Sequence, residues 1–461
     1  MKKTIILFIL FLALAVFVYF YEYKGSQERE KVEELKASLL KIERDEIESV
    51  TLIRSEEDTI TYIREEADNW RIVSPVKTEA DKSAVSGNIN AFINAKIKRR
   101  LETSSGRLKN FGLDPPVAEV VIKSRDSHII HIHIGDETPI RGDLFVTIFS
   151  DLTSQQRDSV EILVTAKNVY DQTQKSLFNL RDKKVAHFDD NQVRKMELIS
   201  PEGEIILEKS SGEWIMAKPS GVPVDGSRVK TFLSSIKNYS VKEFVQEHFV
   251  DRKSYGFDEA VVKLILSLGE ERAIKEIVIG DMKEDDESFY GYESGRSPLF
   301  LVRESTQGSL SKSPFYFQDK KIVKFEGNDI TGIRFSGNYR MILTKEDTLG
   351  WYAYSDSSVK VEDSQMNRLF SRFRSLNARE LVTYKPENLY DYGLSEGALQ
   401  NIPFLEVVLA KGELEVGGFT IGDTVKNDRY IKSQQFPFVY LISTSQVERL
   451  TEWLDEVFNS D

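Results

Sequence analysis

Three histidines lie close together in the segment HIIHIHIGDE, residues 128–137, of a chain that has only five. Imidazole groups bind transition metals and transfer protons near neutral pH, so this spacing raises the question of a metal or proton-transfer site. In a strand, His131 and His133 share one face and His128 lies on the other. Two histidines without a partner carboxylate do not make a site, so we predict an exposed strand face and no metal site.

A second group of candidates is a Gly-Asp pair that recurs three times, at Asp136, Asp281 and Asp423. These carboxylates could act in catalysis or bind a cation. Alternatively, the glycine permits positive φ and the aspartate bonds to nearby backbone N–H groups, which would turn the strand. A catalytic residue need not recur in every copy, so we favour the turn. The same interpretation covers the other recurring aspartates, Asp114, Asp258, Asp182 and Asp319.

Other chemical motifs are missing from the sequence. It has no cysteine, no phosphate-binding glycine loop, no G-x-S-x-G elbow and no H-E-x-x-H zinc pair. We therefore predict that the chain is not an enzyme, with no catalytic, cofactor-binding or metal-binding residues and no cofactor.

The candidate residues belong to a pattern that the chain repeats three times. Trp70, Trp214 and Trp351 are each followed 41 residues later by an aromatic-Gly-apolar triplet, in "FGLD", "YGFD" and "YGLS". A strand ending in "HIGD", "VIGD" or "TIGD" comes next. The other copies have valine or threonine in place of His133, so the histidines are specific to the first copy.

Periodicity predicts the elements of one module. Alternating apolar residues predict a hairpin or meander that ends at the tryptophan, which we expect to fill the core. Asp81, Asp225 and Asp363 are predicted N-caps of one main helix per module, and the first helix is expected to run over 82–100. Further strands follow, around the Gly-Asp turn. The exit segments "LRDKKV" and "FQDKKI" lead into the next copy.

The predicted fold is α+β, with three tandem modules of mainly antiparallel strands and one main helix each. We place module 1 at 44–184, module 2 at 185–321 and module 3 at 322–461. A length of 461 residues suits about three domains. The net charge of −12 argues against a nucleic-acid partner, because such binders need a basic face.

The N-terminus predicts a membrane anchor. Residues 4–21 carry no charge and follow Lys2 and Lys3. As a helix they would span about 27 Å, close to the roughly 30 Å bilayer core. We predict an uncleaved transmembrane anchor at 1–23 and a juxtamembrane helix at 24–43, with a cleaved signal peptide or a buried core helix as alternatives. The positive-inside rule puts the lysines in the cytoplasm and the body in the periplasm or outside the cell.

The combination of an anchor, the tryptophans, "FGLD", "IGD" and "LRDK" resembles the bacterial DUF4340 family, a domain of unknown function. The residues that fit best are Trp70, Pro75, Asp81, Phe111, Asp114, Pro115, Gly135, Asp136 and Leu180–Lys183. The later copies depart from this pattern at Ser395 and at "FQDK". The resemblance implies an envelope protein, often encoded beside ABC-type transporters of the gliding-motility class, and it carries over no catalytic residues.

These observations predict a membrane-anchored extracytoplasmic scaffold or partner-binding protein of the bacterial envelope, accessory to an ABC-type transporter complex. Its expected partners are the lipid bilayer, through residues 4–21, and envelope or transporter proteins. One alternative is a peptide- or glycan-binding protein that uses exposed strand edges or an inter-module groove. A groove lined by aromatic residues, with Phe289, Tyr290 and Tyr292 as candidates, would favour it. A second alternative is an envelope hydrolase with an unrecognised site.

Overall fold

The computed structural model describes residue 19 and residues 37–54, 58–139, 142–150, 159–284, 286–395 and 403–458. Apart from Tyr19, the predicted anchor at 1–23 lies outside these residues, as does most of the predicted juxtamembrane helix at 24–43. Within the described ranges, none of the helices has the length and apolar character needed to cross a bilayer. Residues 38–43 are not helical, in contrast to the prediction, because Leu39, Leu40 and Ile42 are buried in the core of module 1.

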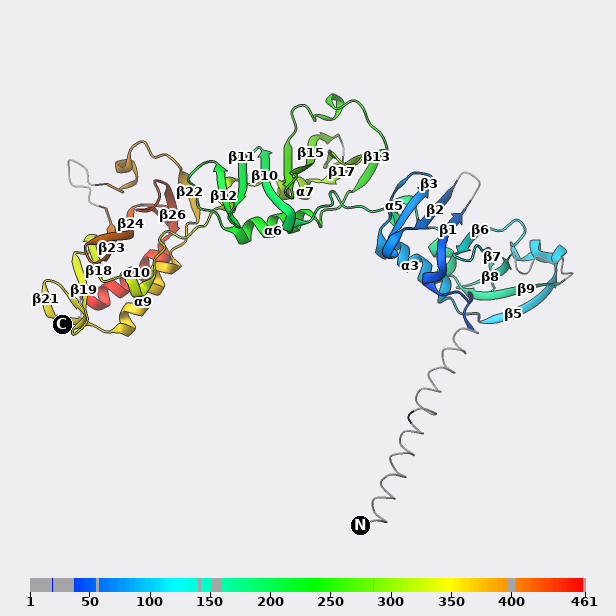
Figure 1. Cartoon of the computed structure of the whole chain (residues 1–461), viewed down its shortest axis with the longest axis horizontal. Coiled ribbons are helices and arrows are strands. Elements are labelled where there is room, and N and C mark those ends of the chain that lie inside the picture. Colours follow the sequence, from blue (N-terminus) through cyan, green and yellow to red (C-terminus); the bar gives the residue numbers. More distant parts are fainter. Residues whose placement is uncertain are drawn as a thin grey trace, which may run out of the picture. The chain divides into compact units, whose positions relative to one another are not determined.

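Module 1 contains a nine-stranded sheet of order β4-β3-β2-β1-β6-β7-β8-β9-β5 (Figure 1). Its strands are β1 (Ile47–Ile53), β2 (Thr59–Arg64), β3 (Trp70–Ser74), β4 (Thr78–Glu79), β5 (Arg99–Ser104), β6 (Ala118–Ser124), β7 (Ile129–Glu137), β8 (Asp143–Ser150) and β9 (Ser159–Ala166). Its helices are α3 (Lys82–Ile93), α4 (Asn168–Thr173) and α5 (Leu177–Leu180).

Module 2 contains an eight-stranded sheet of order β12-β11-β10-β14-β15-β16-β17-β13. Its strands are β10 (Val193–Ser200), β11 (Gly203–Ser210), β12 (Glu213–Lys218), β13 (Glu243–Gln246), β14 (Val262–Leu268), β15 (Ala273–Lys283), β16 (Ser288–Glu293) and β17 (Leu299–Arg303). Its helices are α6 (Gly226–Ile236), α7 (Glu304–Leu310) and α8 (Pro314–Phe317).

Module 3 contains a nine-stranded sheet of order β21-β20-β19-β18-β23-β24-β25-β26-β22. Its strands are β18 (Gly332–Gly337), β19 (Met341–Glu346), β20 (Gly350–Ala353), β21 (Asp356–Val361), β22 (Glu380–Thr383), β23 (Leu405–Lys411), β24 (Leu414–Val425), β25 (Asp428–Ser433) and β26 (Val439–Ser443). Its helices are α9 (Asp363–Ser375) and α10 (Thr444–Phe458).

All three sheets follow one plan, which confirms the predicted α+β class and the threefold repeat. Three strands in module 2, and four in modules 1 and 3, form a meander. The main helix follows, and the next strand takes the far edge of the sheet. A second meander then fills the space between that edge strand and the first strand. The module boundaries themselves stay predictions. Contacts divide the chain into two compact units, 1–184 with 240–249 and 298–301, and the remainder.

The core of module 1 lies between one face of the sheet and α3. Val50 and Leu52 of β1 are fully buried, because alternate side chains of a strand point to the same face. From α3, Val85, Ile89 and Phe92 meet them and are also fully buried. Burial of each such side chain contributes roughly 1.5–3 kcal/mol.

The predicted core role of the tryptophans holds for two of the three. Trp70 and Trp351 are each only 3% exposed, and the Trp70 ring packs edge-on against Tyr62 at 5.6 Å. Trp214 is only half-buried, at the edge strand β12. Each tryptophan lies in the first two residues of the third strand, so the meander continues beyond it and does not end there as predicted.

The predicted N-caps are confirmed in modules 1 and 2. The Asp81 carboxylate accepts a hydrogen bond from the Ala84 N–H at 2.9 Å, and Asp225 caps α6 in the same way. In module 3 the prediction was one residue out, since Glu362 is the N-cap and Asp363 is the first helical residue.

The prediction that the first helix extends over 82–100 was wrong at its C-terminal end. Helix α3 ends at Ile93, and Arg99 and Arg100 begin the edge strand β5. The intervening backbone leaves the helix because it bonds elsewhere: the Ile97 N–H donates to Ala37 and the Lys98 N–H to Val164. Arg99 and Arg100 are therefore part of a sheet edge and not of a helix end.

Candidate functional site

The two recurring glycine motifs pack directly against each other. Gly112 ends the 3-10 helix Ser105–Phe111 in the left-handed region, with φ of +66°. A Cβ atom there would lie 2.6 Å from the Asp136 carboxyl carbon, and one on Gly135 would lie 2.1 Å from the Phe111 carbonyl oxygen. Modules 2 and 3 repeat this interlock at Gly256–Asp281, Gly280–Tyr255, Gly393–Asp423 and Gly422–Tyr392.

The interlock corrects the predicted Gly-Asp turn. Strand β7 continues through Gly135 and Asp136 to Glu137, with a shift in its pairing to β8. Strands β15 and β24 shift at the same place. Glycine is required because the Phe111 backbone approaches it closely, and not because the strand reverses. The recurring pair therefore has a packing role in every module.

The aromatic residues suggested as a ligand groove also pack against this motif. Tyr290 lies 4.9 Å from Tyr255, and Tyr292 meets Phe257 edge-on at 4.8 Å. Phe111 and Phe145 make the matching contact in module 1, at 4.9 Å. Tyr290 and Tyr292 thus pack against the two aromatic residues that flank Gly256. Phe289 lies on the same strand, half-buried.

Residues 129–137 of the histidine segment form β7, as predicted, whereas His128 precedes the strand. The structure adds the carboxylate that the sequence did not reveal. Glu119 of β6 pairs with His133 across the hairpin. Its Oε1 lies 2.6 Å from His131 Nδ1 and 3.7 Å from His133 Nε2. These three residues form a cluster in which one ligand atom of each lies within 4.8 Å of the others. His128 takes no part in it.

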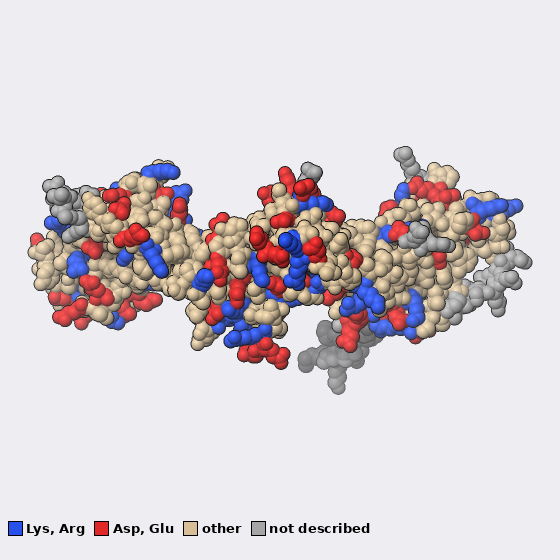
Figure 2. Space-filling model, turned by 90° about the horizontal axis from the view of Figure 1, so that it is seen from above, with Lys and Arg blue, Asp and Glu red and all other residues tan. Residues whose placement is uncertain are grey.

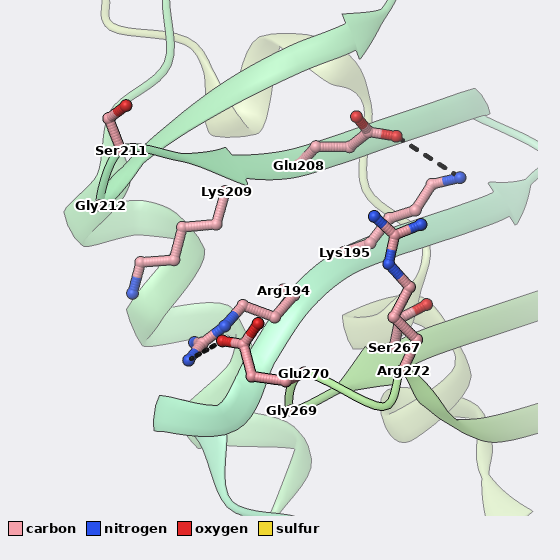
Figure 3. Close-up of a pocket in the computed structure, with 10 residues that line it drawn as sticks. All are labelled: Arg194, Lys195, Glu208, Lys209, Ser211, Gly212, Ser267, Gly269, Glu270 and Arg272. Carbon is pink, nitrogen blue, oxygen red and sulfur yellow. Dashed lines mark ion pairs between the residues drawn. The ribbon is translucent and has the colours of Figure 1, made fainter.

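A hollow of about 590 Å³ in module 2 gathers charged residues around β10 and β11 (Figure 3). Its two carboxylates lie toward different ends, with Glu208 beside Lys195 at 3.5 Å and Glu270 beside Arg194 at 3.8 Å. Glu270 is 94% exposed, so its ion pair is largely screened by solvent. The two carboxylates do not converge on one point, as acid–base catalysis would need. Figure 2 shows acidic and basic side chains intermixed over the face of the molecule that it draws.

The exit segments of modules 1 and 2 make matching backbone contacts. The Leu180 carbonyl accepts from the Asp81 N–H at 2.8 Å, and the Phe317 carbonyl accepts from the Asp225 N–H at 2.9 Å. Further along, the Lys183 and Lys320 carbonyls accept from the segments before β13 and β22, each at 2.7 Å. Each exit segment is thus bonded to the helix N-cap of its own copy and to the residues between the next main helix and its edge strand.

The side chains at the two exits differ. Arg181 is 2% exposed, forms a 2.6 Å ion pair with Glu247 and stacks on Phe244 at 3.6 Å. Gln318 takes its place at the second exit and donates to the Tyr440 hydroxyl. The position of Glu247, directly after the edge strand, is occupied there by Tyr384. The second exit therefore lacks the ion pair found at the first.

A cavity of about 890 Å³ lies beside Tyr384. It is lined by Lys218, Pro219, Ser220, Tyr384, Lys385, Pro386, Glu387, Asn388, Leu389, Ser395, Lys432, Pro437 and Phe438. Within the described part of the chain, the buried Tyr384 hydroxyl and the buried Gln318 Oε1 have no hydrogen-bond partner. An unpaired buried hydroxyl is uncommon in folded proteins and calls for an explanation.

Comparison with known proteins identifies a family. The model of the domain of unknown function DUF4340 matches residues 70–245, 214–352 and 351–461. The chain belongs to the DUF4340 family. No curated protein and no solved structure matches it. Each DUF4340 segment begins at one of the three tryptophans, so the family repeat starts at the third strand of a sheet and not at its first.

The lining of the cavity beside Tyr384 is basic and apolar. Burial raises the pKa of the Tyr384 hydroxyl to about 12 and lowers the pKa of Lys432. Lys432 Nζ donates to the Ser433 carbonyl at 3.2 Å. The lining has three lysines against one glutamate, together with prolines and aromatic rings. Such a surface suits an apolar ligand that carries a negative charge.

Sequence reasoning missed both Glu119 and the Tyr384 cavity. Glu119 could have been found from the register of the β6–β7 hairpin, because it is the residue opposite His133. The cavity depends on contacts between Lys218–Ser220 and module 3, which no local pattern specifies. One signal was present, since Ser395, the residue that departs from the DUF4340 repeat, lines it.

Proposed function

We propose that this DUF4340 protein is a non-enzymatic partner-binding protein of the bacterial envelope, and that the cavity beside Tyr384 receives a segment of its partner. The observation that carries this proposal is the cavity of about 890 Å³, whose lining combines three lysines with prolines and aromatic rings. The first exit has an ion pair at the matching place, between Arg181 and Glu247. The residues that form this pair are replaced by Gln318 and Tyr384 at the second exit, so the side chains beside the cavity are specific to one copy.

The lining indicates what the partner segment is like. Pro219, Pro437 and Phe438 offer apolar contacts, and Tyr384 packs edge-on against Phe438 at 5.3 Å. The surplus of lysines favours a carboxylate, in a chain whose net charge is −12. An apolar, acidic segment of a partner protein meets both conditions. Its carboxylate would pair with the lysine ammonium groups of the lining.

The cellular setting of the proposal rests on the sequence. The uncharged residues 4–21 and the lysines before them support an anchored protein with its body outside the cytoplasm. The DUF4340 resemblance supports an ABC-type transporter complex as the source of the partner. A protease added to intact spheroplasts should then digest the body, and full protection would contradict this orientation.

The hydrolase alternative has less support. In the hollow of Figure 3, each of the two carboxylates pairs with its own cationic side chain, Glu208 with Lys195 and Glu270 with Arg194. In the Tyr384 cavity, Glu387 is the one carboxylate among the lining residues. Neither site pairs a general acid with a general base, so binding is the function that the geometry favours.

The test uses Ser395, because the other two copies have aspartate at this position. Ser395→Asp restores a residue that the fold accepts elsewhere and adds a negative charge to the cavity. The matched control is Ser371→Asp on the exposed side of α9. Full-length protein is solubilised from membranes and captured, and co-purified proteins are identified by mass spectrometry.

We expect the wild-type chain and Ser371→Asp to recover the same envelope protein, and Ser395→Asp to lose it. Because the chain has no cysteine, Ser220→Cys adds a single thiol at the cavity for cross-linking. The cross-link should join the same protein, whereas Ser371→Cys should not. Recovery of the chain alone, or equal recovery by all variants, would rule out this cavity as the partner site.

A further inference from the structure

We propose that Glu119, His131 and His133 bind a divalent transition-metal ion, with Zn²⁺ the best match. Two imidazoles and one carboxylate form a ligand set that proteins use for zinc. One ligand atom of each residue lies within 4.8 Å of the others. This proposal is independent of the Tyr384 cavity, because the three residues belong to the sheet of module 1.

The sheet places the three side chains on one face. His131 and His133 alternate along β7, and Glu119 lies opposite His133 on β6. The ring of His133 meets Phe149 edge-on at 5.0 Å, and Phe149 packs against the small apolar cluster of Leu108, Leu113 and Ile162. The imidazole is therefore supported by a rigid neighbour, which lowers the entropy lost when a metal binds.

The distances fit a metal after a small adjustment. Two atoms bound to one tetrahedral Zn²⁺ lie roughly 3.4 Å apart, because each bond is about 2.0–2.1 Å long. The 3.7 Å from Glu119 Oε1 to His133 Nε2 is already near this value. The 2.6 Å from Oε1 to His131 Nδ1 is a hydrogen bond that would open when the ion replaces its proton. His131 is 42% exposed, so its ring has room to move.

The other modules show that the fold does not need this cluster. Lys263 and Glu276 occupy the places of Glu119 and His131 in module 2 and form a 2.6 Å ion pair. In module 3, Glu406 remains but Gly418 replaces the first histidine. The set of three metal ligands is thus specific to module 1.

The ligand types select the ion. Imidazole nitrogen suits Zn²⁺, Cu²⁺ and Ni²⁺, whereas Mg²⁺ and Ca²⁺ prefer all-oxygen sites. Three protein ligands leave at least one tetrahedral position for water or for another ligand. All three side chains are partly exposed, at 22%, 42% and 25% for Glu119, His131 and His133, so that position is open to solvent.

The experiment measures Zn²⁺ binding to the full chain in detergent after treatment with a chelator. Isothermal titration should show an equivalent of Zn²⁺ that His131→Gln, His133→Gln and Glu119→Gln each remove. Loss of a supporting residue around a metal site costs about 10–100-fold in affinity, so loss of a ligand should cost at least about 100-fold. His128→Gln is the matched control and should bind as the wild type does. Mg²⁺ should not compete.

A second measurement distinguishes loss of Zn²⁺ binding from loss of the folded structure. The chain has five histidines, so selective labelling gives a simple imidazole NMR spectrum. Zn²⁺ should shift the signals of His131 and His133 and leave that of His128 unchanged. Circular dichroism without metal should be the same for all variants. No Zn²⁺ binding, or equal binding by His131→Gln and the wild type, would overturn the proposal.

Discussion

Gly135 lies so close to Phe111 that a Cβ atom on the glycine would be 2.1 Å from the Phe111 carbonyl oxygen. The same relationship joins Gly280 to Tyr255 and Gly422 to Tyr392, each at 2.0 Å. Two motifs separated in sequence are thus a single structural unit. Their recurrence in every module follows from packing and does not indicate shared chemistry.

Gly135→Ala should destabilise module 1 by at least about 3 kcal/mol, because backbone atoms cannot move aside as a flexible side chain can. Gly87→Ala is the control, since a Cβ on this exposed α3 residue meets nothing within 4 Å. It should stabilise the helix by roughly 0.5–1 kcal/mol. Urea unfolding combined with hydrogen exchange over β6 and β7 measures both changes. Equal effects of the two variants would contradict the interlock.

Glu247→Ala should cost about 2–4 kcal/mol, because it leaves the buried Arg181 guanidinium without its carboxylate. The double variant Glu247→Ala with Arg181→Met should recover part of the lost free energy of unfolding. A double-mutant cycle from urea unfolding measures the coupling between them. Purely additive effects would show that the 2.6 Å contact contributes no net stability.

The cap of α6 should make stability depend on pH in the acid range. Burial raises the pKa of Asp225, but hydrogen bonds from the Ser227 hydroxyl and from the Arg228 and Ser227 N–H groups outweigh it, so the pKa lies below the usual 3.8. This contribution is present above about pH 3.8 and is lost as pH falls through the lower, folded-state value.

Asp225→Asn keeps the cap without the titrating group, so unfolding between pH 2 and pH 5 should lose this part of the acid dependence. Asp225→Ala should cost about 1 kcal/mol at neutral pH. The two variants therefore separate capping from charge. An unchanged acid profile for Asp225→Asn would show that other carboxylates cause it.

Two ion pairs of module 2 should differ sharply in their importance. Lys275→Met leaves the fully buried Glu293 carboxylate without its 2.9 Å partner and should cost roughly 3–5 kcal/mol. Arg194→Ala breaks a 3.8 Å pair with a glutamate that is 94% exposed and should cost less than about 0.5 kcal/mol. Urea unfolding at low and high salt compares them, and similar losses would contradict the difference in burial.

Much of the fold could be predicted from periodic patterns. Alternation predicted the meanders, and the polar residue before an apolar helical period predicted the caps Asp81 and Asp225. These features depend on residues close together in the sequence. The strand after each main helix could not be placed, because its position at the far edge of the sheet depends on pairing with the last strand, such as β5 with β9.

The sites were harder to predict for the same reason. His131 and His133 were visible in the sequence, but their carboxylate neighbour comes from another strand and required the register of the hairpin. Tyr384 and Gln318 carry buried polar atoms that only tertiary contacts reveal. The Gly-Asp pairs were found by repetition but assigned the wrong geometry, since a close backbone approach leaves no local signal.

The exit segment after α8 has a mechanical consequence. Residues 317–322 are hydrogen-bonded both to the segment that begins α6 and to the residues that follow α9. A force that pulls module 3 from module 2 must therefore break several backbone hydrogen bonds in addition to side-chain contacts.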